Sequence, residues 1–513
     1  METFNPSRRQ VLKGSAAAMA VGAIGSLSGL YSRQALAATS PMFNLPVASP
    51  YGALAPVADL STGLELLQLP PGFSYRSFGW SGDLMDDGQR CPDRHDGMGL
   101  MRSPGHALGV GRGRGNGRGP ELVLVRNHER GGVSAPIQAP GMYDTGDIGN
   151  GQRAGGGTTN LVWRDGDWLR VEASLGGTLV NCAGGPTPWG TWLSCEEIKT
   201  NATSSTGRRH GYVFEVEAVA ERTTGRPIVG MGRFSHEAVA IDPRTGVVYL
   251  TEDDRNKSAL YRYIPHDRAG RHGSLENGGR LQAACVRGRP NADLTTAIIG
   301  AEYELEWVDI PDPDLDSIEA PAGFPDVSSG ETLSGPFAQA WSAGALRMAR
   351  GEGIWHANGK LFIVDTATGV DSRGRKGRGE GAVWVLDLAS QRLRALFVSG
   401  HQLAANNPDN ITVSPRGGVV LCEDGGNSPD SYGPGARLLG LTRDGASFYL
   451  AKNNVELTST QIANAGKSVE EGDYRDSEFC GACWTPDGRT LFVNLQSPGI
   501  TVAITGPWLR GPL

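Results

Sequence analysis

Residues 242–253 read DPRTGVVYLTED: a proline-containing turn, a run of aliphatic and aromatic residues, and two acidic residues at its end. A second β-like run, Ala259–Tyr263, follows shortly afterwards. Short runs rich in Val, Tyr and Leu and bounded by Gly, Pro or Asp are typical of β-strands. This stretch therefore predicts a turn, a strand with a polar end, and a second strand.

The same unit recurs along the chain. Further strand-like runs with polar ends are Leu122–Val125, Gly190–Cys195, Lys360–Val364, Val419–Cys422 and Arg489–Val493. Most are roughly 55 to 70 residues apart, with one gap of about 110, and repeats of this size are typical of β-propellers. We predict an all-β chain, a six-bladed β-propeller with residues 266–340 as an inter-blade insertion; a pair of β-sandwiches is the alternative.

The N-terminus predicts export. Ser7–Lys13 reads SRRQVLK, a weakly apolar stretch follows from Gly14 to Leu30, and Ala35–Ala37 resembles a cleavage site. This pattern indicates a twin-arginine signal peptide, removed near Ala37, rather than a retained anchor. We expect residues 1–37 to be the signal, 38–66 an N-terminal extension and 67–513 the propeller. The mature protein should be periplasmic or secreted, with the twin-arginine translocase as its partner during export.

The net charge of the chain limits the classes of partner that the protein can bind. The chain has a net charge of −7. Removing a signal that holds four basic residues and one acidic residue leaves the mature chain near −10. Such a surface argues against nucleic acid and anionic membranes. After the signal, no apolar run approaches the ~20 residues of a membrane span, so we expect no stable membrane insertion. The excess of acidic over basic residues suits a protein that binds cations.

The acidic strand ends predict a cation site. In a propeller, the strands near the axis place their ends at one mouth of the channel, so carboxylates from several blades would converge there. Unpaired carboxylates in one small volume repel each other, and burial raises the cost further. Such a cluster persists when cations lie among the acids, and carboxylate oxygens suit Ca²⁺. Histidines such as His128 and His236 are expected to be hydrogen-bonded core residues.

The cysteines leave two interpretations open. There are seven, at positions 91, 182, 195, 285, 422, 480 and 483. An odd number leaves at least one unpaired. Cys182 lies in NCAGGPTPWGTWLSCEE, residues 181–197, before the turn and off the strand. It could pair with Cys195 across the hairpin, or it could bind a transition metal as a thiolate.

Arg350 and Glu352 form a further candidate pair. They are two residues apart, so on an extended segment they face the same side. Arginine binds planar or tetrahedral oxyanions such as phosphate well. The alternative is an exposed ion pair of little energetic consequence.

The sequence resembles the PhoX family of secreted bacterial alkaline phosphatases from about Leu67 to the C-terminus. The resemblance is carried by Arg126–Glu129, Asn181–Gly190, Cys195–Glu197, Ser235–Glu237, Thr251–Asp253, Ala349–Gly353, Asp409–Ile411 and Cys422–Asp424. The stretch from 181 to 197 is the most specific of these.

The resemblance implies metal-dependent hydrolysis of small phosphate monoesters by a protein that holds Fe³⁺ and Ca²⁺ at the propeller mouth, and we expect the protein to be a monomer. A cysteine that bridges two irons in the family corresponds to Cys182, and an arginine that contacts phosphate corresponds to Arg350. The carboxylate ligands correspond to Glu129, Glu197, Glu237, Glu352 and Glu423.

Two other functions remain as alternatives. The first is a propeller lactonase or phosphotriesterase that uses one divalent metal and needs no bridging thiolate. The second is a non-catalytic calcium-binding propeller, in which Arg350 would be only a surface charge. The role of Cys182 separates the phosphatase from the first, and the role of Arg350 separates it from the second.

Overall fold

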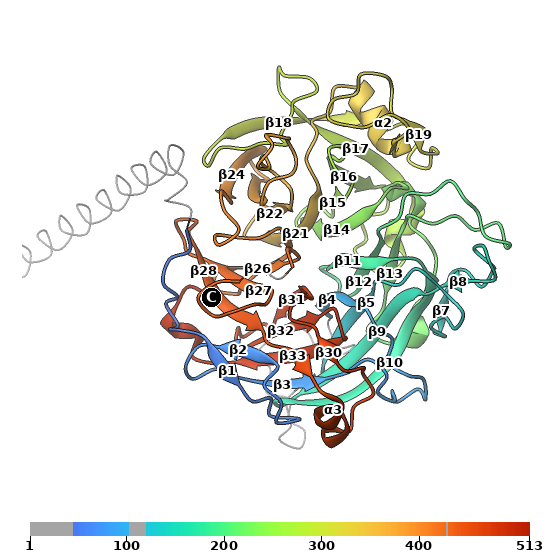
Figure 1. The fold of residues 1–513 in the computed structure, drawn as a ribbon. Helices are drawn as coiled ribbons and strands as arrows, with labels where there is room; N and C mark the ends of the chain where they lie inside the picture. Colours follow the sequence, from blue (N-terminus) through green and yellow to red (C-terminus); the bar gives the residue numbers. More distant parts are fainter. Residues whose placement is uncertain (1–44, 102–119, 427–428) are drawn as a thin grey trace, which may run out of the picture.

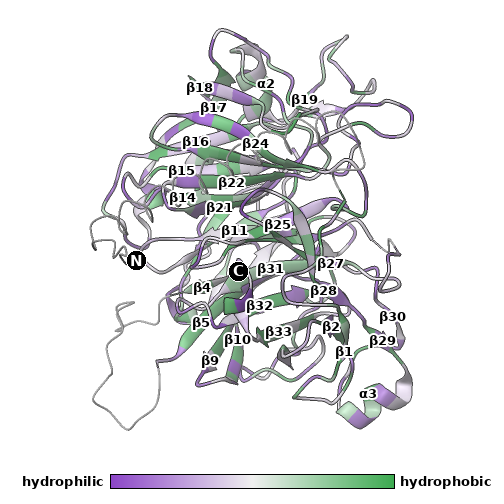
Figure 2. Ribbon diagram, turned by 90° about the vertical axis from the view of Figure 1, so that its left-hand side faces the viewer, coloured by the Kyte–Doolittle hydropathy of each residue, from purple (hydrophilic) through white to green (hydrophobic). Residues whose placement is uncertain are grey.

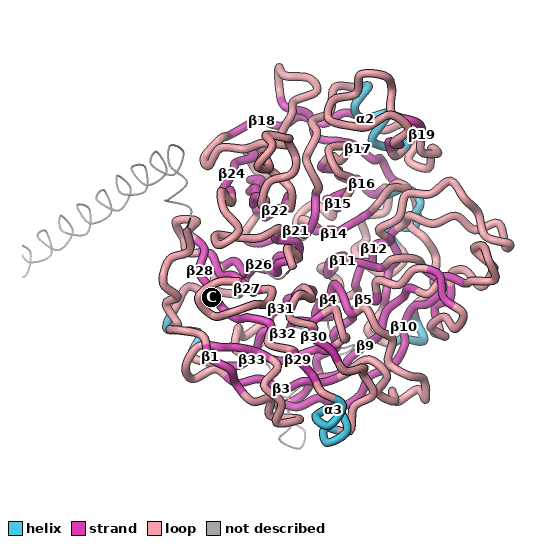
Figure 3. The backbone as a smooth tube through the Cα atoms, viewed as in Figure 1, coloured by secondary structure: helices cyan, strands magenta, loops and turns pink. Residues whose placement is uncertain are grey.

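Strands dominate the computed structural model, which describes residues 45–101, 120–426 and 429–513. Figure 1 shows the sheets arranged around a central axis like the blades of a propeller. Figure 3 shows that helices lie only at the periphery of the described chain. The prediction of an all-β, propeller-like fold is confirmed. The twin-arginine segment, 1–37, lies outside the described residues.

Five sheets of three or more strands make up the described part of the chain. In sheet order, the first is β4 (His95–Met101), β5 (Leu122–His128), β9 (Gly156–Arg164), β10 (Asp167–Thr178) and β7 (Gly141–Met142). The second is β11 (Asn181–Pro186), β12 (Trp192–Glu196) and β13 (Val213–Val216). The third is β3 (Ser74–Phe78), β33 (Ile500–Thr505), β32 (Thr490–Leu495) and β31 (Phe479–Trp484).

The other two sheets are larger. One runs β1 (Ala55–Val57), β2 (Leu67–Leu69), β28 (Ser447–Asn453), β27 (Arg437–Leu441), β26 (Val419–Glu423) and β25 (Pro408–Val413). The nine-stranded sheet runs β14 (His236–Ile241), β15 (Val248–Glu252), β16 (Leu260–Pro265), β17 (Gly279–Val286), β18 (Glu302–Asp309), β24 (Arg392–Val398), β23 (Ala382–Asp387), β22 (Lys360–Asp365) and β21 (Gly351–Ala357).

The smaller elements lie in connections. Two-stranded pairs are β6 (Gly132–Val133) with β8 (Arg153–Ala154), β19 (Ile318–Glu319) with β20 (Thr332–Leu333), and β29 (Glu456–Leu457) with β30 (Gly472–Asp473). The α-helices among the described residues are α2 (Gly335–Ser342) and α3 (Ser459–Ala465). Short 3₁₀ turns occur at Ala220–Arg222, Val229–Met231, Ser274–Asn277 and Trp508–Arg510.

The predicted repeat is present in the structure. The stretch that predicted it forms β15, which pairs antiparallel with β14 before it and β16 after it. The other polar-ended runs form β5, β12, β22, β26 and β32, each paired antiparallel with the strand that precedes it. Buried Val, Leu, Ile and Tyr side chains hold these strands together, and Figure 2 shows the hydrophobic residues concentrated on them. Burial of apolar area is the main stabilising term in such an arrangement.

The first strands of these pairs surround the axis. In order around it they are β4, β11, β14, β21, β25 and β31, and each packs against the next. The ring closes because β31 packs against β4. Residues at or next to the starts of these strands lie in overlapping groups, so the strands begin at the same end of the channel.

The N-terminal segment joins the C-terminal sheets. β3 pairs with β33, and β2 pairs with β28, so strands from the two ends of the chain share sheets. The Tyr75 hydroxyl fixes the segment, accepting hydrogen bonds from the backbone N–H of Leu66 at 2.8 Å and Leu67 at 3.2 Å. It lies 2.9 Å from the carbonyl of Val57. Part of the predicted extension, 38–66, thus packs with the propeller.

The predicted insertion, 266–340, contributes to a sheet. β17 extends β16, and β18 pairs with both β17 and β24, so these two strands join neighbouring blades into the nine-stranded sheet. The remaining part contains the β19–β20 pair and most of α2 at the rim, as Figure 1 shows.

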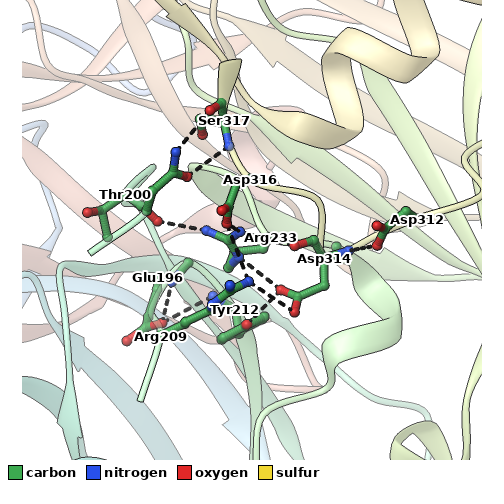
Figure 4. Close-up of polar contacts among 12 residues, drawn as sticks. Glu196, Thr200, Arg209, Tyr212, Arg233, Asp312, Asp314, Asp316 and Ser317 are labelled. Carbon is green, nitrogen blue, oxygen red and sulfur yellow. Dashed lines mark hydrogen bonds and ion pairs between the residues drawn. The ribbon is translucent and has the colours of Figure 1, made fainter. Parts of the chain in front are cut away.

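A buried arginine anchors that outer part. Arg233 donates to Asp314 Oδ1 at 2.9 Å and to the carbonyl of Thr200 at 2.7 Å, and it pairs with Asp316 (Figure 4). The Tyr212 hydroxyl also donates to Asp314, at 2.7 Å. Because the Arg233 side chain is 1% exposed, its charge depends on these partners. The contacts fix the insertion as a wall beside the loop after β12.

Tyr75→Phe should lower the free energy of unfolding by roughly 1–3 kcal/mol, because it removes the acceptor of two buried N–H groups. Thermal or urea unfolding measures this loss. Tyr474→Phe is the matched control, since the Tyr474 hydroxyl donates only to Glu470 O in an exposed contact. Equal stability of both variants would contradict the role given to Tyr75.

Candidate metal centre

The first strands share a backbone irregularity at the channel mouth. The pairs His95–His128, Asn181–Glu196, His236–Glu252, Gly351–Asp365 and Pro408–Glu423 are each followed by a register shift before the next pair. A shift of this kind is a β-bulge, which turns a side chain out of the normal alternation of the strand. The residues directly after the first members are Asp96, Cys182, Glu237, Glu352 and Asp409.

The second strands supply acids at the same edge. The residues directly after the last paired positions of β5, β12, β15 and β26 are Glu129, Glu197, Asp253 and Asp424. In an antiparallel pair, the start of one strand lies beside the end of the other. Both sets of side chains therefore meet at one mouth of the channel.

Four overlapping groups of potential ligand atoms result. They are Cys182, Glu197 and Glu237; Glu237, Glu352 and Asp409; Asp409, Asp424 and Glu478; and Asp96, Glu129 and Glu478. Within each group, one ligand atom of every residue lies within 4.8 Å of the others. Three residues belong to two groups each, so the cluster is continuous.

Cys182 lies before the turn, as predicted, but it is part of β11 rather than off the strand. The bulge after Asn181 allows a strand residue to face the channel, which strand periodicity alone does not predict. The Cys182 Sγ is 3.2 Å from the carbonyl oxygen of His236. Cys182 and Cys195 are both free, as are the other five cysteines, so the structure contains no disulfide across this hairpin.

Asn127 fixes the backbone at Cys182. Its Nδ2 donates to the carbonyls of Cys182 at 3.0 Å and Ala183 at 2.6 Å. Its Oδ1 accepts from Trp192 Nε1 and Ser194 Oγ, both at 3.0 Å. All four hydrogen-bonding positions of this buried amide are used, which holds the bulge in one conformation.

The histidines are hydrogen-bonded core residues, as expected. His128 has Nδ1 2.9 Å from Asp93 O and Nε2 3.0 Å from Thr159 Oγ1. His236 has Nε2 2.9 Å from Gly232 O. Neither belongs to a ligand group found among the described residues.

Glu129, Glu197, Glu237 and Glu352 lie in the ligand groups, but the structure places Glu423 elsewhere. Arg437 donates to both Glu423 oxygens, at 2.6 and 2.9 Å, and the Asn406 N–H donates to one of them at 2.7 Å. Successive side chains of a strand point to opposite sides, so Glu423 faces the interior of its blade and Asp424 faces the axis. The neighbouring residue therefore holds the position expected for Glu423.

Sequence reasoning also missed Asp96, Asp409 and Glu478. Asp409 had a signal, because it lies in the Asp409–Ile411 motif of the resemblance. Asp96 follows His95 as Glu237 follows His236, at the bulge of its strand. Glu478 precedes β31 and has no equivalent in this pattern, so only the structure reveals it.

The electrostatics of the cluster are unfavourable without cations. Burial, followed by repulsion from Asp424, raises the pKa of Asp409 to about 7. Burial and neighbouring carboxylates also raise the pKa of Glu197, Glu237 and Glu478. Burial, Glu237 and Glu197 likewise raise the pKa of the Cys182 thiol. Positive charge inside the cluster would lower these pKa values.

Arg94 pairs with Glu129 of this cluster, and Arg350 is a second positive charge beside it. Its Nε donates to Asp253 Oδ1 at 2.6 Å, its Nη2 pairs with Asp253 Oδ2, and Nη2 is 3.3 Å from Glu352 Oε1. Asp365 accepts the Arg350 backbone N–H at 3.0 Å, which fixes the main chain. The side chain is 26% exposed, so it can reach a solute in the mouth.

Two family models match this chain. Residues 49–175 and 170–499 match the family described as alkaline phosphatase PhoX, and residues 5–25 match the twin-arginine translocation signal. The signal assigns the chain to the periplasm or the exterior of the cell. None of the helices in the described ranges is long and apolar enough to cross a membrane. No curated protein matches the chain.

One similar solved structure is Pseudomonas fluorescens PhoX in complex with vanadate, a transition-state analogue. The two chains are 16% identical, and the match covers 90% of this chain and 99% of the Pseudomonas chain. The TM-score of 0.58 supports the same fold.

Two structures of other proteins match more weakly. The WD40 β-propeller domain of Doa1 is 11% identical over 74% of this chain and 99% of its own, with a TM-score of 0.33. The PQQ domain of a Coprinopsis cinerea pyranose dehydrogenase is 12% identical, and the match covers 86% of this chain and 97% of that domain, with a TM-score of 0.27. Neither score bears on the fold.

The family match spans most of the chain, and this protein belongs to the PhoX family of alkaline phosphatases, which hydrolyse phosphate esters.

Proposed function

We propose that the carboxylates and thiol at the channel mouth hold Fe³⁺ and Ca²⁺, and that this centre hydrolyses small phosphate monoesters. The observation that carries the proposal is the continuity of the four ligand groups, which share Glu237, Asp409 and Glu478. A single cation would not require so many acids in contact. The ring of first strands further supports six blades around this centre.

The donor types suggest how the cations divide. Cys182, Glu197 and Glu237 combine sulfur with oxygen, which suits a transition metal such as iron. The groups built on Asp96, Asp409, Asp424, Glu129 and Glu478 offer only oxygen, which suits Ca²⁺. We propose Asp424 as the ligand in place of Glu423, because Arg437 already binds both Glu423 oxygens.

The residues fit such cations. Glu352 Oε1 is buried and forms no hydrogen bond, so its only described partner is Arg350 at 3.3 Å. A buried acceptor without a hydrogen bond costs free energy that a cation would recover. The raised pKa values have the same origin and would fall once positive charge enters the cluster.

Arg350 would bind and orient the ester. Its guanidinium can donate two parallel hydrogen bonds to phosphate oxygens while Asp253 fixes its direction. The bound cations would supply Lewis-acid stabilisation of the charge that develops on phosphate. Asn127 keeps Cys182 in place, and Glu352 is the member of the cluster that contacts Arg350. No serine or threonine nucleophile is needed for this scheme.

Cys182→Ala should lose iron, visible colour and at least ~100-fold of the turnover of p-nitrophenyl phosphate together, because the thiolate ligand is gone. Elemental analysis, absorbance and an assay measure the three quantities. Cys195→Ala, a free buried cysteine on the neighbouring strand, is the control and should retain all three. Full activity in Cys182→Ala would refute the assignment.

Arg350→Ala should lower kcat/KM by about 100-fold, since it removes a charge that stabilises the phosphoryl group. Arg350→Lys keeps the charge but loses the two-pronged geometry, so it should recover only part of the loss. Steady-state kinetics with p-nitrophenyl phosphate provide the test. An unchanged kcat/KM in Arg350→Ala would instead favour a surface ion pair.

Metal-free protein should become less stable as pH rises. The folded pKa of Asp409 lies at about 7, above its unfolded value near 4, so the folded state binds protons more tightly. Stability should therefore fall as pH climbs through this window, and protein reloaded with Fe³⁺ and Ca²⁺ should resist the fall. Melting temperatures of both forms between pH 4 and pH 8 measure the effect. A metal-free melting temperature independent of pH would contradict it.

A further inference from the structure

A basic loop lies beside Arg350 at the channel mouth. Residues 366–381 connect β22 to β23, and the loop begins where the Thr366 N–H donates to the Arg350 carbonyl at 3.1 Å. It contains four basic residues, Arg373, Arg375, Lys376 and Arg378, in an otherwise acidic protein. Arg375 pairs with Asp371, and Lys376 pairs with Asp293. Among the described residues, Arg378 has no such partner.

A second arginine approaches this loop from the neighbouring blade. Arg255 follows β15, two residues after Asp253, and its Nη1 donates to the Gly377 carbonyl at 2.7 Å. No carboxylate in the described chain forms an ion pair with it. Asp253 cannot fully compensate it, because both Asp253 oxygens bind Arg350.

Positive charges therefore gather at this rim. Burial lowers the pKa of Arg255, and the charges of Arg350 and Arg378 lower it further. Asp253 and Glu352 oppose this effect only in part, and guanidinium groups that repel one another favour the binding of an anion between them. Phosphate suits this arrangement, because each arginine can donate to it with two N–H groups.

The rim is held in one conformation. Gly377 packs so closely on Asn256 that a Cβ at this position would lie 1.8 Å from Asn256 Oδ1, and its φ is +62°. Asn407 Nδ2 donates to the carbonyls of Thr366 at 2.8 Å and Gly379 at 3.2 Å. A basic surface that is already ordered loses little entropy when it binds a ligand.

We propose that Arg255 and Arg378 form a subsite for a second anionic group of the substrate, so that the protein prefers phosphate esters that carry another phosphate. This inference rests on the proposed binding of the scissile phosphate at Arg350. A bisphosphate would place one group at the metal centre and Arg350 and the other at the rim. A monophosphate with a neutral remainder would leave the rim unused.

The test compares kcat/KM for glucose 1,6-bisphosphate with that for glucose 6-phosphate, measured as phosphate release by the metal-loaded protein. The wild type should favour the bisphosphate. In Arg255→Ala and in Arg378→Ala, the ratio of the two values should fall about tenfold, mainly through a higher KM for the bisphosphate. High salt should lower the ratio in the wild type as well.

Arg373→Ala is the matched control on the same loop, because Arg373 is exposed and its side chain has no described contact; its ratio should equal that of the wild type. Arg255→Lys should preserve much of the preference, which separates lost charge from misfolding. A ratio that is equal in the wild type and both alanine variants overturns the subsite. A wild type that releases phosphate from neither sugar overturns the proposed function instead.

Discussion

Mutual repulsion among acids at one end of a narrow channel is the constraint on which this structure depends. Antiparallel pairing brings the start of each first strand beside the end of the second, and bulges aim Asp96, Cys182, Glu237, Glu352 and Asp409 at the axis. Buried carboxylates this close together favour protons or cations between them. Cation binding at this cluster would be linked to folding, because these side chains meet only in the folded chain. Twin-arginine export, which carries folded proteins, suits such a centre.

At three strand ends, the residue before the inward-facing acid has a separate role. Glu196 accepts the backbone N–H groups of Leu179, Gly211 and Tyr212, as Figure 4 shows in part, and lies 2.6 Å from His210 Nδ1. Glu252 is bound by Ser334 at 2.6 Å, and Glu423 is bound by Arg437. These carboxylates hold the strand ends in place, so that the next residue, Glu197, Asp253 or Asp424, faces the channel. Each acidic pair thus combines one structural carboxylate with one at the mouth.

Sequence patterns predicted the strands well because each strand is specified by residues that are close together along the chain. Runs such as Val419–Cys422 are apolar, rich in β-branched residues and bounded by turns, and β26 covers this run with one further residue. The same patterns could not separate Glu423 from Asp424, since both are acids at a strand end and only the direction of each side chain differs. Cys182 shows the complementary difficulty, because a bulge is a property of the strand pair and not of either strand alone.

The sequence by itself determined the export signal, the turn-strand repeat, the acidic strand ends and the family motifs, because each is written in residues close together along the chain. The tertiary structure alone decided which acids meet. Glu478 shares one group with Asp96 and Glu129 although it lies hundreds of positions from both, because the closed ring places β31 against β4. It also decided that Arg255 lies against the basic loop of another blade. Such neighbours are set by how the blades close around the axis, and no pattern within one blade specifies them.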